Sequence, residues 1–191
     1  MQTNQQEEEE EDDCSICNES LPKLASKLVR MTCCGKAMHK KCHGDIYKSS
    51  MSNEQKNRCV MCRTKYPASE EEATEQLRPW VEKGKAWAQC ILGQRYERGL
   101  GVDQSYQRAR ELHELAANQG DAGSQFALGA MYYSGQGVDQ SDEKAREYYE
   151  AAAVQGYANA QHDLGVIYAN GQGVDQNYER AAEYFEAATR Q

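Results

Sequence analysis

Seven of the eight cysteines lie between residues 14 and 62, and a histidine stands among them at a regular spacing. Together they form four pairs of potential donors: Cys14 with Cys17, Cys33 with Cys34, His39 with Cys42, and Cys59 with Cys62. Thiols and imidazoles at this density are disulfide partners, reactive groups or metal ligands. In a reducing compartment, paired cysteines favour metal binding over disulfides.

The first 13 residues indicate which compartment applies. They contain no apolar run and no basic start, so they are neither a signal peptide nor a transit peptide. No stretch of the chain approaches the roughly 20 apolar residues needed to span a membrane. We therefore expect an intracellular protein, cytoplasmic and/or nuclear, without a membrane partner. Residues 1–13, acidic throughout Glu7 to Asp13, are predicted to be a disordered tail.

The four donor pairs match the requirements of zinc. A structural zinc site has four nitrogen or sulfur donors in a tetrahedron, so eight donors make two closed sites. Closed sites have no open position for a substrate and are structural rather than catalytic. A segment of about 50 residues is too small for a good core, and metal binding should supply much of its folding energy. The spacing therefore predicts two structural Zn²⁺ ions in residues 14–67.

The order pair, pair, His-x-x-Cys, pair resembles the RING finger family, in which the pairs interleave as a cross-brace. The resemblance implies that one zinc is shared by Cys14, Cys17, His39 and Cys42, and the other by Cys33, Cys34, Cys59 and Cys62. The blocks CCGKAMHKKC and CVMCRTKYP look most like the RING variant of a ubiquitin ligase subunit of the CCR–NOT complex. That variant separates its second pair by one residue, whereas Cys33 and Cys34 are adjacent, so His43 is an alternative donor.

This resemblance implies a role in ubiquitin transfer. A RING has no covalent nucleophile: it docks a ubiquitin-conjugating enzyme that carries ubiquitin as a thioester, and it holds that thioester in a reactive arrangement. At the positions that the family uses for docking, this chain has Ile16 and Val60. Arg63 follows the last ligand, where active members often carry a cation that hydrogen-bonds both the enzyme and ubiquitin.

Two other interpretations of the cysteine-rich segment stay open. The ligand order is also that of PHD fingers, which read histone tails, although Asn57 stands where those usually have a tryptophan. The second alternative is a non-catalytic scaffold whose zinc finger only contacts proteins. Nucleic acid is not an expected partner. The formal charge of +8 over residues 14–67 falls to about +5 with seven thiolates and two Zn²⁺, and no aromatic stacking platform accompanies it.

The second half of the chain repeats itself with a fixed period. Three units begin at Gly84, Gly120 and Gly156, and each has 36 residues. A period of this size predicts a stacked helical solenoid. Within each unit we expect a helix, a loop built on GxGVDQ and a second helix. A Leu-Gly step and the tyrosine that follows it should place the first helix in the core.

These units resemble Sel1-like repeats, relatives of tetratricopeptide repeats that serve as protein-binding scaffolds. The resemblance implies that residues 84–191 bind a protein target, which the sequence does not identify. Positions that vary between units are the candidates for the partner surface. They are Trp87, Gly123 and Asn159 at one position, and Cys90, Phe126 and His162 at another.

Three further side chains of the repeats carry groups that are often chemically active. Cys90 has no basic neighbour in the sequence to activate it, so we do not expect it to accept ubiquitin. His113 and His162 each stand alone on a helix without other potential metal ligands, and both are predicted to be surface residues.

Residues 68–83 link the two parts. Ser69 and Glu72 match a capping box that opens a helix, and Pro79 should kink this helix or begin a new turn. Trp80 is expected to pack on the first repeat, making the helix a half-repeat cap. The last unit has no comparable cap, which indicates a fragment or a final face that binds something.

The expected fold class is a small zinc-stabilised RING cross-brace domain plus an all-α helical-repeat solenoid. The predicted function is that of a RING-type ubiquitin ligase whose repeats hold the target.

Overall fold

The computed structural model describes residues 28–30, 37–39, 59 and 64–190. The chain divides into two compact units, residues 1–65 and 66–191. The described part of the first unit includes an antiparallel hairpin of β1, Leu28–Arg30, and β2, Ala37–His39. The segment between the strands contains Cys33 and Cys34. Like the predicted acidic tail and most of the predicted zinc finger, it lies outside the described residues.

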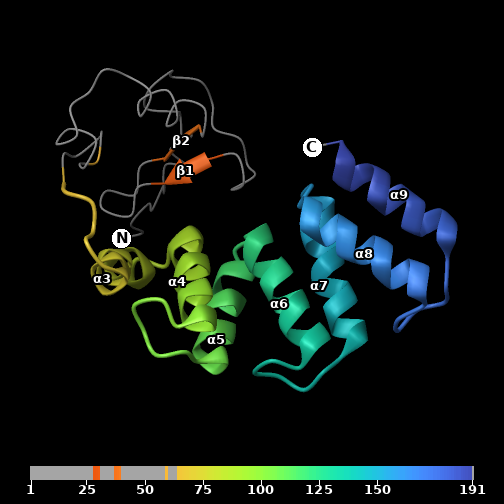
Figure 1. Cartoon of the computed structure of the whole chain (residues 1–191), viewed down its shortest axis with the longest axis horizontal. Coiled ribbons are helices and arrows are strands. Elements are labelled where there is room, and N and C mark those ends of the chain that lie inside the picture. Colours follow the sequence, from red (N-terminus) through yellow and green to blue (C-terminus); the bar gives the residue numbers. More distant parts are fainter. Residues whose placement is uncertain (1–27, 31–36, 40–58, 60–63, 191) are drawn as a thin grey trace, which may run out of the picture. The chain divides into compact units, whose positions relative to one another are not determined.

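The described part of the second unit is helical throughout its regular structure (Figure 1). Its helices are α3 (Glu70–Glu82), α4 (Ala86–Arg98), α5 (Tyr106–Ala117), α6 (Ala122–Ser134), α7 (Asp142–Val154), α8 (Ala158–Asn170) and α9 (Tyr178–Thr189). They pack most closely in the pairs α4–α5, α6–α7 and α8–α9, and each pair packs on the next. This confirms the predicted all-α solenoid. Among the described helices, none is both long and apolar enough to cross a bilayer.

The residues at the helix borders explain where the repeat helices begin and end. Ser105, Ser141 and Asn177 each accept a hydrogen bond from the backbone N–H three residues later, at 3.3, 3.3 and 2.9 Å. They thereby cap the second helix of each repeat. The first helices end at glycines in the left-handed region, with φ of 68° at Gly99 and 70° at Gly135. The GxGVDQ loops end the helices as predicted.

A glycine in the first helix of each repeat lets the second helix approach closely. A Cβ on Gly129 would lie 2.6 Å from the ring of Tyr149, and one on Gly165 would lie 2.7 Å from the ring of Phe185. The leucine before each glycine, Leu164 for example, is buried. The Leu-Gly steps therefore build the core through close helix–helix packing, as the sequence predicts.

α3 continues the 36-residue period toward the N-terminus. Its cap, Ser69, stands one period before Ser105. The backbone of Glu70 lies against the loop glycine Gly101, and the corresponding residues Tyr106 and Asp142 lie against Gly137 and Gly173 one and two repeats later. A Cβ on Gly101, whose φ is 68°, would collide with the carbonyl group of Glu70. α3 therefore packs as the second half of a repeat, in agreement with the predicted half-repeat cap.

The start of α3 follows the capping-box prediction in part. Ser69 Oγ accepts a hydrogen bond from the N–H of Glu72 at 3.2 Å. The Glu72 carboxylate accepts from the N–H of Ala68 at 2.8 Å, one residue before the expected donor. Pro79 lies inside α3, which continues to Glu82, so the proline does not begin a new turn.

The contact between α3 and α4 combines an ion pair with aromatic packing. Arg95 on α4 donates to Glu70 Oε2 at 2.8 Å and to the carbonyl of Leu100 at 3.3 Å. The rings of Trp80 and Trp87 lie 5.8 Å apart, as the predicted packing of Trp80 on the first repeat requires. α3 is thus fixed on the repeat array through both backbone and side-chain contacts.

Candidate functional site

The described residues cover only part of the predicted zinc finger. Outside them lie the ligands Cys14, Cys17, Cys33, Cys34, Cys42 and Cys62, the alternative donor His43, and the conjugating-enzyme contacts Ile16, Val60 and Arg63. His39 ends β2, and Cys59 is described with its side chain. The two zinc sites and the conjugating-enzyme contacts therefore stay predictions.

Of the eight predicted zinc ligands, His39 and Cys59 fall within the described residues. The Cys59 side chain is buried, and its N–H donates to the carbonyl of Thr64 at 2.7 Å. In the hairpin, His39 pairs with Leu28 at the opposite end from the connection that holds the second cysteine pair.

His113 is buried, so the prediction that it is a surface residue is wrong. Its side chain is 0 % exposed. Nδ1 lies 3.3 Å from Ser124 Oγ, and Nε2 lies 3.3 Å from a carboxylate oxygen of Glu97. The ring fills the position that Tyr149 holds one repeat later. Ser124 lies within hydrogen-bond distance of Nδ1, whereas Nε2 has no hydrogen-bond partner among the described residues, although the Glu97 carboxylate lies nearby. His162 is exposed, as predicted.

Cys90 belongs to the core, so the prediction that its position forms a partner surface is wrong for this repeat. The side chain is 8 % exposed. Burial, followed by the negative charge of Asp121, raises the pKa of the Cys90 thiol to about 12. Such a thiol is protonated at neutral pH and is a poor nucleophile. At the same position one repeat later, Phe126 also packs inward, with 5.6 Å between its ring and that of Tyr149.

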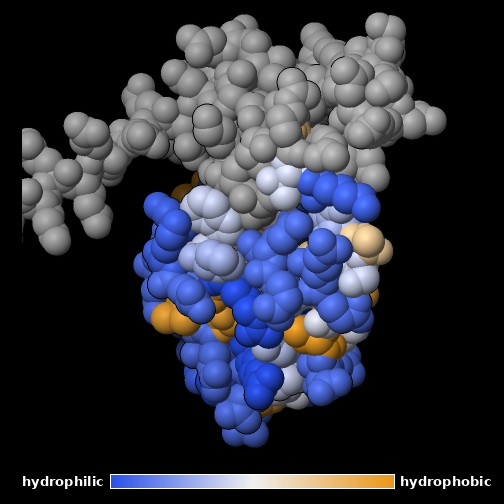
Figure 2. Space-filling model, turned by 90° about the vertical axis from the view of Figure 1, so that its left-hand side faces the viewer, coloured by the Kyte–Doolittle hydropathy of each residue, from blue (hydrophilic) through white to orange (hydrophobic). Residues whose placement is uncertain are grey.

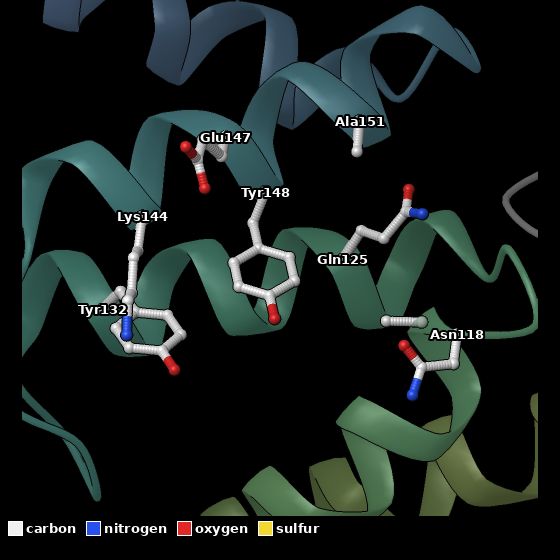
Figure 3. A pocket seen from close by; sticks show the side chains of 8 residues that line it. Asn118, Gln125, Tyr132, Lys144, Glu147, Tyr148 and Ala151 are labelled. Carbon is white, nitrogen blue, oxygen red and sulfur yellow. The ribbon is translucent and has the colours of Figure 1, made fainter.

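A cleft of about 320 Å³ opens between α6, α7 and the end of α5 (Figure 3). We call it the second-repeat cleft; it is lined by Ala117, Asn118, Gln125, Tyr132, Lys144, Glu147, Tyr148 and Ala151. The rings of Tyr132 and Tyr148 are stacked, with 5.6 Å between centroids and 8° between planes. Nζ of Lys144 lies 5.0 Å from the centroid of the Tyr132 ring. The cleft therefore has an aromatic wall that carries a cation.

The same cleft recurs one repeat later between α7, α8 and α9, with a volume of about 370 Å³. This third-repeat cleft is lined by Glu150, Tyr168, Arg180, Glu183, Tyr184 and Ala187. Tyr168 and Tyr184 stack with 5.6 Å between centroids and 13° between planes. Arg180 lies 5.2 Å above the Tyr168 ring and donates to its hydroxyl at 3.1 Å. Both clefts thus share one architecture.

Ionisation in the two clefts follows from burial. Burial, and next the neighbouring tyrosine of each stack, raises the pKa of Tyr148 and of Tyr184. Both phenols are therefore neutral at physiological pH. Glu147 and Glu183 are exposed, and neither forms an ion pair within the described residues. Each cleft consequently combines neutral aromatic faces with one carboxylate that forms no ion pair in the described part of the chain.

The first repeat has the cation but not the stack. Arg108 lies 5.5 Å above the ring of Tyr96, as its counterparts do in the other repeats. Leu112 stands where the second and third repeats have the outer tyrosine, and Leu115, at the next helical turn, is 53 % exposed. The first repeat therefore presents an apolar surface at the corresponding place.

The clefts are not predicted from the sequence, because the recurring tyrosines are expected to be core residues alone. The available signal was a basic residue four positions before a tyrosine, at Lys144 and Tyr148 and again at Arg180 and Tyr184.

The face of the repeats seen in Figure 2 is largely hydrophilic, with small separate apolar patches. On that face, recognition would depend on polar and charged side chains.

Comparison with known proteins identifies the repeats. The Sel1 repeat family model matches residues 88–121, 122–157 and 158–191. The crystal structure of a Sel1 repeat protein from Oxalobacter formigenes is 26% identical, with a TM-score of 0.62 over 66% of this chain and 51% of that protein. A protective antigen of uropathogenic Escherichia coli with an SLR fold is 32% identical, with a TM-score of 0.62 over 67% of this chain and 27% of the antigen. No curated protein matches the chain.

This chain spans about half of the Oxalobacter formigenes protein and about a quarter of the Escherichia coli antigen. The family model covers more than half of this chain, and each matched segment corresponds to one helix–loop–helix unit of the structure. Stacked repeats of this type present extended surfaces for binding other proteins. The chain belongs to the Sel1 repeat family, and residues 88–191 form its helical protein-interaction domain.

Proposed function

We propose that the protein is a RING-type ubiquitin ligase. Residues 14–67 bind two structural Zn²⁺ and dock a ubiquitin-conjugating enzyme, while the Sel1 repeats hold a target protein. The observation that carries the proposal is the spacing of eight thiol and imidazole donors within residues 14–62. A repeat domain suited to protein binding, on the same chain, supplies the second half of such an adaptor.

The described atoms of the first unit support the zinc-binding part. Cys59 has a buried side chain, and its backbone closes a turn with Thr64 at 2.7 Å. The β1–β2 hairpin would carry the second cysteine pair in its connection and His39 at its end. Bound zinc would supply folding free energy and hold these donors in a rigid arrangement.

The transfer step requires no nucleophile from this chain. Ile16 and Val60 would give the conjugating enzyme an apolar contact, and the Arg63 guanidinium would donate hydrogen bonds to both the enzyme and ubiquitin. Their effect is positional: a thioester held in one geometry reacts faster with a lysine of the target than a freely moving one. The repeats contribute by keeping that target close.

Metal content of the purified full chain tests the first part. Elemental analysis should give about two zinc ions per chain, as two sites of four donors require. Cys62→Ser should lower the content, whereas the matched control Cys90→Ser, in the repeat core, should leave it unchanged. Absence of zinc, or disulfides joining the cysteines of residues 14–62, would refute the zinc finger.

An autoubiquitination assay with a panel of conjugating enzymes tests the second part. We expect ubiquitin chains with at least one enzyme, and a large loss of chain formation in Ile16→Ala and Arg63→Ala, with zinc content retained. If zinc is bound but no enzyme yields chains, the second candidate function is favoured: a non-catalytic scaffold with a structural zinc finger. Eight donors in closed sites fit that function equally well.

A further inference from the structure

The second-repeat and third-repeat clefts are one structure built twice. In each, a tyrosine from the first helix of the repeat stacks on a tyrosine from the second helix at 5.6 Å. The tyrosines, the cation and the glutamate of one cleft each stand 36 residues from their counterparts in the other. Two equivalent clefts in neighbouring repeats suit a ligand with repeating side chains, such as an extended peptide.

In each cleft, the first tyrosine of the stack already has a positively charged side chain over its ring. Lys144 lies over Tyr132 at 5.0 Å, and Arg180 lies over Tyr168 at 5.2 Å. Cations are attracted to aromatic faces by the ring quadrupole. In Figure 3, Lys144 lies over Tyr132, whereas no labelled side chain covers the ring of Tyr148. The ring of Tyr148 is therefore available to a cation from outside (Figure 3).

A carboxylate accompanies the second tyrosine of each stack. Glu147 precedes Tyr148 and Glu183 precedes Tyr184, and both glutamates line their clefts without an ion pair in the described part of the chain. A tyrosine ring and a carboxylate that line the same cleft together complement the guanidinium of arginine or the ammonium of lysine.

The charge of the whole repeat unit favours the same ligand. Residues 66–191 contain 11 lysines and arginines against 20 acidic residues, a formal charge of −9. A net negative surface attracts basic segments and repels acidic ones over distances of about a Debye length, ~8 Å at physiological salt. Charge complementarity therefore selects a basic partner over an acidic one.

We propose that the second-repeat and third-repeat clefts dock a basic segment of a partner protein, with one arginine or lysine side chain in each cleft. One cation lies against Tyr148 and Glu147, and the next lies against Tyr184 and Glu183. The inference depends on the protein-binding role of the Sel1 repeats and names the chemistry of the partner. It is independent of zinc and of ubiquitin transfer.

Fluorescence anisotropy on the full chain tests this docking. The probe is a labelled peptide of about ten residues with arginines separated by serine and glycine. Extended, it spans roughly 33 Å, more than two helix layers of 8–10 Å each. The comparison peptide has glutamate in place of arginine. We expect saturable binding of the arginine peptide, weakened by salt, and no binding of the glutamate peptide.

Paired substitutions distinguish peptide binding in the clefts from nonspecific attraction to the negatively charged repeats. The double variant Tyr148→Leu with Tyr184→Leu copies the residue that the first repeat already has, so it should keep the fold, as circular dichroism can check. It leaves the charge unchanged and should raise the Kd about tenfold, because two cation–aromatic contacts are lost. Glu147→Gln with Glu183→Gln should weaken binding similarly. Glu111→Gln, at the same position of the first repeat, should change the Kd less than twofold.

Three results would overturn the proposal. The first is unchanged affinity in the folded Tyr148→Leu, Tyr184→Leu variant, which would mean that the net negative charge of the repeats alone explains the binding. The second is equal weakening by Glu111→Gln. The third is concentration-dependent self-association in sedimentation experiments that the tyrosine variant abolishes while peptide binding persists, because the clefts would then hold a second copy of this chain. A loss of peptide binding with intact ubiquitin chain formation would leave the ligase proposal untouched.

Discussion

The second and third repeats share a backbone and most of their contacts, yet they are buried to different extents. Tyr149 in the second repeat is 2 % exposed, whereas Phe185 at the same position of the third is only half-buried. Ala152 is fully buried, and Ala188 is partly exposed. The difference arises because α8 covers the second repeat, and no described helix covers α9 in this way. In this array, the core of a repeat is completed by its neighbour.

Truncation of the core aromatic residue should show the largest contrast between the two repeats. Tyr149→Ala should lower the free energy of unfolding by about 3–5 kcal/mol, because a large buried ring leaves a cavity. Phe185→Ala should cost roughly half as much, because less of that ring is buried. Urea unfolding followed by circular dichroism measures both. Equal losses would mean that the final helix is covered as fully as α7.

Filling the glycine beneath these rings should give a smaller contrast in the same direction. Gly129→Ala should cost about 1–3 kcal/mol, because its Cβ would lie 2.6 Å from a ring that cannot move. At Gly165, Phe185 can shift outward, so the overpacking is relieved and the intrinsic preference of alanine for helices offsets part of the cost. Melting temperatures of the two variants give the comparison. Greater damage at Gly165 would contradict the ordering.

Alkaline pH extends the comparison to the first repeat, where a thiol occupies a core position. The pKa of Cys90 is about 12 in the folded protein against a reference of 9.0. A raised pKa stabilises the fold fully below the unfolded value, and this contribution disappears as pH rises from about 9 to 12. The stability lost between pH 7 and pH 10 should therefore be about 1.4 kcal/mol smaller in Cys90→Ala than in the wild type. Parallel pH profiles for the two proteins would argue against a buried thiol.

Helix capping should give the smallest effects. Ser141→Ala removes the acceptor for the N–H of Lys144, which should cost about 1 kcal/mol of global stability. Asn177→Ala removes the equivalent bond at 2.9 Å but lies on the terminal helix. We expect its main effect to be faster hydrogen exchange in α9, because terminal elements open locally at low cost. Equal global destabilisation by both variants would indicate that the repeats unfold as one unit.

The repeat fold was predictable from sequence because its determinants are local. A 36-residue period, left-handed glycines such as Gly99, and caps such as Ser105 each act within a few residues. His113 was misplaced for the opposite reason. Ser124 and Glu97, which face its two nitrogens, come from other helices. The residues adjacent to His113 in the sequence do not indicate that these two side chains lie beside it.

The clefts escaped prediction for a related reason. Tyr132 and Tyr148 stack across two helices, so their separation depends on how closely those helices pack. The sequence shows where each tyrosine stands, but it does not show which face of each tyrosine ring remains accessible to a ligand. The ligands of the predicted zinc finger, by contrast, were inferred from spacing alone, and measurement of bound zinc is the direct test of that inference.

The docking of α3 has a consequence for how such a protein can change in length. The first residue of α3 lies against Gly101, as the first residues of α5 and α7 lie against Gly137 and Gly173, so the same kind of joint recurs along the array. A whole repeat could be gained or lost between two neighbouring repeats, and the helices on either side could still pack through the same contacts. The length of the repeat array, and with it the surface offered to a partner, would then change in steps of one helix pair.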